Sequence, residues 1–221
     1  MRFLPRSAEY TKRFLGLAVA ALAVTGLLIG TVQLSSAKAK AKAGVWHSVS
    51  IDKHPQQDST WCGPAAGETL LSAFGLRFKQ QKTLADQMHT GFLGTAPSDA
   101  TAALNAQLKK NNKSIRYGHK AGIGPNELYT AAKRGLDHGA PSMIVVKSRN
   151  IWYPHASIGT AHYLVIYGYN DNWVVGKKSY GKTWAVYDPA DNTLHHLAVK
   201  DYGSEGKNAG YWGGDVIVPL I

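Results

Sequence analysis

The feature that most constrains the fold is a change of pattern near Pro141, where helix-like segments give way to strand-like segments. Segments before Pro141 have apolar residues at helical spacing, with proline near a start or glycine after an end. They predict helices at residues 63–75, 79–90, 98–111 and 126–138. Segments after it are rich in β-branched and aromatic residues and predict strands at 142–148, 162–169, 183–189 and 215–221. A helical half followed by an antiparallel sheet indicates the α+β class.

Composition excludes several kinds of protein. The chain has 221 residues, 44% of them hydrophobic, which is enough for one globular core. Its single cysteine, Cys62, excludes an intrachain disulfide, a multi-cysteine zinc site and an iron–sulfur centre. The net charge is +11, but residues 1–43 carry seven basic side chains and one acidic one, so over half of this charge lies there. The lysine-rich run at 37–44 (AKAKAKAG) has no aromatic residues between its lysines for base stacking, so we expect no nucleic-acid partner.

The amino-terminal segment has the pattern of an export signal. Residues 14–34 are uncharged and largely apolar, and basic residues precede them. Small residues follow and offer cleavage sites after Ala37, Ala39 or Ala41. The run is also as long as the roughly 20 residues of a membrane anchor, and either reading places the rest of the chain outside the cytoplasm. We predict a signal peptide or anchor with a basic spacer at 1–43 and a secreted domain at 44–221, which associates with a membrane only if the signal stays uncleaved.

Cys62 lies at the start of the first predicted helix. A thiol in that position feels the positive end of the helix dipole, which lowers its pKa and favours the nucleophilic thiolate. The alternative is a small buried apolar residue, which is what most free cysteines are. Cys62 is therefore a candidate nucleophile.

His162 opens one predicted strand and Asp188 closes the next. In a hairpin centred on Val175 the two residues face each other directly, with Cβ atoms about 5 Å apart. A carboxylate at that distance can orient the imidazole and leave its other nitrogen for the cysteine. The alternatives are a histidine in a structural hydrogen bond and an Asp-Pro turn, and Asp191 and Asn192 remain possible orienting residues.

An acyl-transfer site also needs donors for an oxyanion. The backbone N–H of Cys62 is one candidate, because it lies at the helix start. A side-chain amide from Gln56 or Gln57 is a second candidate. The alternative for both glutamines is simple exposure to solvent.

Together these residues resemble a known family. The segment 56–66 (QQDSTWCGPAA), followed by Ala161-His162-Tyr163 and Asp188-Pro189, is similar to papain-like cysteine peptidases. The resemblance covers about residues 50–190 and is closest to the bacterial branch with the leader-processing (double-glycine) peptidases of bacteriocin exporters and their secreted relatives. It implies a papain-like fold, in which a helical lobe carrying the Cys helix packs on an antiparallel sheet carrying the His and Asp.

The resemblance also implies roles for particular residues. Cys62 would be the nucleophile, His162 the base, Asp188 its orienting partner and Gln56, six positions before the cysteine, the oxyanion donor. The interval between His162 and Asp188 is longer than in compact members, and we expect the extra residues in the hairpin loop. Because no transporter domain follows, we expect a freestanding exported protein rather than a leader-processing one.

We therefore expect an exported cysteine peptidase that acts on peptides or proteins without a cofactor. Metal binding is not expected, because the adjacent His195 and His196 would point to opposite faces of a strand. Two alternatives stay open. One is acyl transfer to an amine, as in transglutaminases, and the other is a non-catalytic papain-fold module that binds at the cell surface.

Overall fold

A computed structural model describes residues 42–147, 161–202 and 215–221 of this chain. The predicted signal or anchor, and most of the spacer that follows it, lie outside these residues. Within the described ranges, no helix combines the length and the apolar character that crossing a membrane requires.

Four helices form where the sequence predicts them, within a few residues at each end. They are α1 (Cys62–Ser72), α2 (Gln81–Gln87), α3 (Pro97–Lys110) and α4 (Pro125–Asp137). Pro97 and Pro125 begin their helices, where a missing N–H costs no hydrogen bond. The second helix is shorter than the predicted 79–90, because His89 adopts a positive φ of 48° and ends the helical path.

The strands form a sheet in which every pairing is antiparallel. They are β1 (Trp46–Ser48), β2 (Tyr117–Ala121), β3 (Ser142–Lys147), β4 (Ala161–Val175), β5 (Lys178–Asp188), β6 (Thr193–Ala198) and β7 (Asp215–Pro219). The order is β2-β7-β3-β4-β5-β6, and β1 pairs with β4. The sequence did not predict β1, β2 or β6. In β2 only Tyr117 is buried, so the strand has no apolar run to reveal it.

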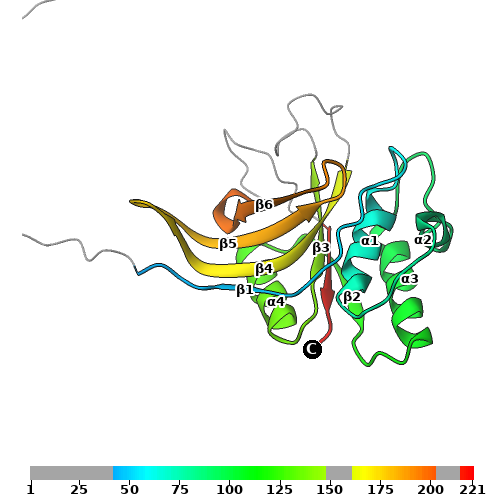
Figure 1. The fold of residues 1–221 in the computed structure, drawn as a ribbon, viewed down its shortest axis with the longest axis horizontal. Coiled ribbons are helices and arrows are strands. Elements are labelled where there is room, and N and C mark those ends of the chain that lie inside the picture. The colour runs from blue at the N-terminus through cyan, green and yellow to red at the C-terminus, as the bar shows by residue number, and fades with distance from the viewer. Residues whose placement is uncertain (1–41, 148–160, 203–214) are drawn as a thin grey trace, which may run out of the picture. The chain divides into compact units, whose positions relative to one another are not determined.

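The sheet is covered on both faces, as Figure 1 shows, with α1 to α3 on one side and α4 on the other. Alternate residues of β4 enter the two cores: Tyr163 and Val165 pack with α1 and α3, while Leu164 and Ile166 pack with α4. Burial on both faces explains why residues 163–167 of this strand are all apolar or aromatic. The predicted α+β class is confirmed, as is the packing of a helical lobe on an antiparallel sheet.

The hairpin register differs from the prediction. The turn consists of Gly176 and Lys177 alone, and Gly176 has the positive φ of 60° that suits the first position of a type II′ turn. The residues predicted to form a long loop instead extend β4 and β5. A one-residue shift in pairing at Tyr167 marks a β-bulge.

Beyond that bulge Val165 pairs with Tyr187, which places Asp188 beside Leu164. The prediction that His162 lies directly opposite Asp188 is therefore wrong by two residues. Because the offset is two, the histidine and the aspartate still share one face of the sheet.

Candidate active site

Cys62 is the first residue of α1 and is only 8% exposed. Pro64 fits the first turn because no N–H is needed there. The position of Gly63 has no room for a larger residue: a Cβ there would lie 2.5 Å from Thr95 Oγ1 and 2.7 Å from Thr95 Cβ. The Cys-Gly-Pro sequence therefore lets the helix begin against the segment that carries Thr95.

The Cys62 sulfur meets the first residues of β4. The His162 side chain lies within hydrogen-bonding reach of the sulfur, and the backbone N–H groups of Tyr163 and Gly63 also help to lower the pKa of the thiol. Burial raises the pKa of the Cys62 thiol, but these hydrogen bonds and the charge on His162 outweigh burial and hold the pKa below its usual value. The arrangement favours the thiolate.

His162 connects the sulfur to Asp188. Its Nε2 lies 2.8 Å from Asp188 Oδ1, and both side chains are buried. Asp188 Oδ1 also accepts the backbone N–H of Ala190 at 2.8 Å, which helps to fix the carboxylate. With Nε2 engaged by Asp188, Nδ1 is the ring nitrogen left for Cys62.

The protonation of His162 follows from these partners. Burial lowers the pKa of the imidazole, but the hydrogen bonds to Asp188 and Cys62 and their negative charges raise it to about 10. A raised imidazole pKa beside a lowered thiol pKa favours a thiolate–imidazolium pair. Cys62, His162 and Asp188 thus form a continuous chain of sulfur, imidazole and carboxylate.

The two candidate glutamines lie in a segment without regular structure just before α1. The backbone N–H of Gln56 donates to Pro189 O at 2.9 Å, which ties it to the residue after Asp188. Its side-chain Nε2 donates to Asp58 O at 3.2 Å, and its Oε1 is buried with no hydrogen-bond partner in the described structure. The side chain of Gln57 is exposed. Gln56 is therefore the glutamine held against the carboxylate end of the site.

Asp191 and Asn192, the two alternative orienting residues, have other partners. Asp191 Oδ2 lies 2.7 Å from His195 Nε2, and Asn192 Oδ1 accepts the Tyr187 hydroxyl at 3.0 Å. Asp188 is the residue whose contact with His162, at 2.8 Å, fits the orienting position.

Sequence reasoning missed two residues around the site. The backbone N–H of Tyr163 helps to lower the pKa of Cys62, and its hydroxyl donates to Thr95 O at 3.0 Å. Thr95 in turn packs against Gly63. These contacts join a strand, a helix start and a loop that are far apart in the chain, and no local sequence pattern predicts them.

No group of three or more His, Cys, Asp or Glu residues in the described part of the chain is arranged to hold a metal ion. His196 instead stacks on Trp46 and packs at a tilt against Trp173, with ring centroids 4.6 Å away in each case. Its neighbour His195 binds Asp191 and Thr193.

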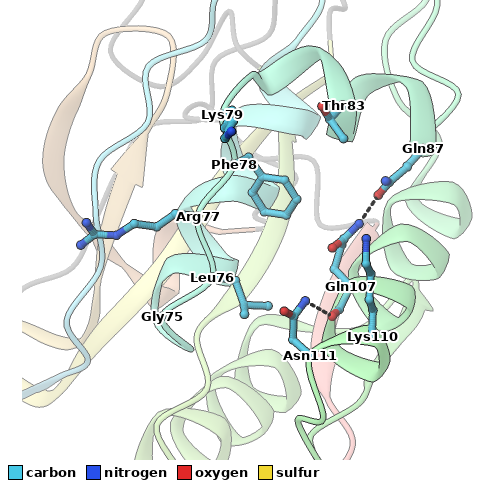
Figure 2. A pocket seen from close by; sticks show the side chains of 10 residues that line it. All are labelled: Gly75, Leu76, Arg77, Phe78, Lys79, Thr83, Gln87, Gln107, Lys110 and Asn111. Carbon is cyan, nitrogen blue, oxygen red and sulfur yellow. Dashed lines mark hydrogen bonds between the residues drawn. The ribbon is translucent and has the colours of Figure 1, made fainter.

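A cavity of about 440 Å³ lies elsewhere in the fold (Figure 2). It is lined by the segment that follows α1 and by side chains of α2 and α3. In Figure 2 the Phe78 ring borders the cavity, whereas Arg77 points away from it and pairs with Asp52 at 3.1 Å. An 11-residue helix is about 16 Å long, so α1 separates this cavity from Cys62 at its other end. The cavity includes none of the three linked residues.

A comparison with known protein families identifies the family of this chain. A model of the Peptidase_C39 like family matches residues 49–212. No match is found among curated protein sequences.

Three solved structures are similar in shape. The peptidase domain of Streptococcus ComA, a bifunctional ABC transporter of a quorum-sensing pathway, is 15% identical, with a TM-score of 0.47 over 79% of this chain and 98% of that one. A double glycine motif protease from an AMS/PCAT transporter, in complex with the leader peptide, is 12% identical, with a TM-score of 0.48 over 80% and 98%. UfSP from C. elegans is 14% identical, with a TM-score of 0.48 over 80% of this chain and 34% of that one.

Proposed function

Because the chain belongs to the Peptidase_C39 like family, we propose that it is a cysteine peptidase with Cys62 as nucleophile, His162 as general acid and base, and Asp188 as the orienting carboxylate. The observation that carries this proposal is the chain of contacts from sulfur to imidazole to carboxylate. A merely structural cysteine has no need of a buried ion pair, whose desolvation is costly.

The chemistry follows from the thiolate–imidazolium pair. The Cys62 sulfur attacks the carbonyl carbon of a peptide bond, a C–S bond forms, and the carbonyl oxygen takes the negative charge. As the intermediate collapses, the C–N bond breaks and the His162 imidazolium gives its proton to the leaving amine. His162 then takes a proton from water, which attacks the thioester and releases the acid and the free thiolate.

The oxyanion needs hydrogen-bond donors at the point where charge develops. The backbone N–H of Cys62 is one donor, because the first N–H groups of a helix have no acceptor within it. The Nε2 of Gln56 is the second. Its contact with Ser59 O is 3.5 Å, at the limit for a hydrogen bond, so this amide can turn a hydrogen towards a substrate oxygen.

The substrate class is a peptide or protein, in keeping with the family. Residues 1–43 direct export of the remaining chain, on the basis of their charge and hydropathy pattern. Export is tested separately by expressing the full chain in a bacterial host and sequencing the amino terminus of any protein in the medium. A new terminus after Ala37, Ala39 or Ala41 supports export with cleavage, and intact chain retained in the cytoplasm contradicts export.

The activity is tested by incubating residues 44–221 and the Cys62→Ala variant with a mixed peptide library and identifying products by mass spectrometry. We expect new termini only with the wild-type protein. Identical product patterns from both proteins would refute a cysteine-dependent mechanism. A primary amine added to the same mixture distinguishes hydrolysis from acyl transfer, since transfer leaves an amide in place of the free acid and raises the product mass by that of the amine less one water.

A further inference from the structure

Gln56 lies in a segment that has neither helix nor strand to hold it. An oxyanion donor must lie within about 2.7–3.1 Å of the oxygen that it stabilises, and a displacement of about 1 Å can cost a hundredfold in rate. The position of Gln56 must therefore be set by contacts from elsewhere in the fold.

Two of those contacts come from one buried side chain, Gln81, the first residue of α2, which is 1% exposed. Its Oε1 accepts the backbone N–H of Gln57 at 2.9 Å, and its Nε2 donates to Pro55 O at 3.2 Å. The amide thus binds the backbone immediately before and immediately after Gln56. A backbone N–H donor on one side and a carbonyl acceptor on the other also fix which end of this amide is oxygen.

Gln81 is itself held by a hydrogen bond to α1. Its Nε2 donates to Glu68 Oε2 at 2.9 Å, and Glu68 is a buried residue of α1, the helix that begins at Cys62. The same glutamine therefore connects the helix of the nucleophile to the segment of the oxyanion donor. The backbone N–H of Gln56 adds a further hydrogen bond, to Pro189 O, that fixes this segment.

We propose that Gln81 is a positioning residue that holds Gln56 in register with Cys62, through paired hydrogen bonds to Pro55 and Gln57. This inference rests on the proposed function, since it assigns a task to Gln56. Gln81 touches neither the sulfur nor the substrate. Its loss should weaken stabilisation of the oxyanion while leaving the thiolate–imidazolium pair intact.

The test compares Gln81→Met with Gln107→Met. Methionine keeps the length of the side chain and removes its hydrogen bonds. Gln107 is a matched control, because it is also a mostly buried helical glutamine and donates to Gln87 Oε1 at 2.6 Å, on the side of the helical lobe where the cavity lies. For each variant, kcat, KM and the rate of Cys62 alkylation by iodoacetamide are measured below the midpoint of thermal unfolding.

We expect Gln81→Met to lower kcat about 10-fold or more, with KM changed less than about 3-fold and the alkylation rate within about 2-fold of wild type. Gln107→Met should leave all three near wild type. In a Gln56→Ala background, which alone should cost about 10²–10³ in kcat, adding Gln81→Met should have little further effect. If Gln81→Met does not fold, Gln81→Asn, whose shorter amide cannot reach both partners, takes its place.

Three results would overturn the inference: unchanged kcat in the folded variant, a fall in alkylation rate as large as the fall in kcat, or losses that multiply in the double variant. Each of these presupposes a wild-type protein whose cleavage depends on Cys62. Absence of that cleavage would refute the proposed function itself, and the role of Gln81 with it, so the two failures are distinguishable.

Discussion

Asp188 lies diagonally across the β4–β5 hairpin from His162, and its Oδ1 nevertheless meets the histidine Nε2 at 2.8 Å. Diagonal neighbours on a sheet are within reach of long side chains, provided that both point to the same face. The bulge at Tyr167 brings both side chains to the same face. The two-residue turn alone would place His162 and Asp188 on opposite faces, and the single extra residue restores their common face.

Replacing Asp188 by asparagine removes the negative charge beside His162 and keeps the size and shape of the side chain. Because Asp188 raises the pKa of His162, the Asp188→Asn variant should have a lower imidazole pKa. We expect kcat/KM to fall by about 10²-fold, and the alkaline limb of its pH profile to move to lower pH. The profile measured from pH 4 to 11 checks this. An alkaline limb that stays in place would show that Asp188 does not set the protonation of His162.

The wild-type pH profile should itself be bell-shaped and broad. Its acid limb reports formation of the Cys62 thiolate, whose pKa is lowered, so activity should appear below the ordinary thiol pKa of about 8.5. Its alkaline limb reports loss of the His162 proton, which the raised pKa places near 10. The pH dependence of kcat/KM measures both limbs. Activity that rises only above pH 8 would contradict a preformed ion pair.

Gly63→Ala tests the close contact between the helix start and Thr95. The added Cβ would meet Thr95 Oγ1 at 2.5 Å, so we expect a loss of about 1–3 kcal/mol in the free energy of unfolding, together with reduced activity. Gly91→Ala is the control, because a Cβ there has nothing within 4 Å, and it should change stability by less than about 0.5 kcal/mol. Urea unfolding of both variants gives the comparison. Equal losses would mean that the contact with Thr95 is not what requires glycine.

The helices and the main strands could be predicted because their signals are local. Pro64 and the apolar residues that follow it indicate a helix that begins beside Cys62, and the apolar run after His162 indicates a buried strand. Strand β2 escaped prediction because burial of Tyr117 alone leaves no pattern to detect.

The parts of the site that the sequence did not predict depend on contacts between distant segments. No residue type marks Tyr167 as the place of a bulge, so the pairing of His162 and Asp188 could not be predicted from the position of the turn. Gln81 is separated from Pro55 and Gln57 by more than twenty residues, and its hydrogen bonds exist only once α2 has packed. Candidate residues for the chemistry could be named from sequence, whereas the residues that position them could not.

The most direct measurement of the central claim is the rate at which iodoacetamide alkylates Cys62 at pH 6, in the wild type and in a His162→Gln variant. If His162 keeps the sulfur ionised, the wild type should react faster, by about 10-fold for each unit by which its thiol pKa lies below that of the variant, since thiolate is the reactive form and an ordinary thiol is almost fully protonated at that pH. Equal rates in the two folded proteins would mean that the imidazole does not activate the sulfur, and would contradict the account.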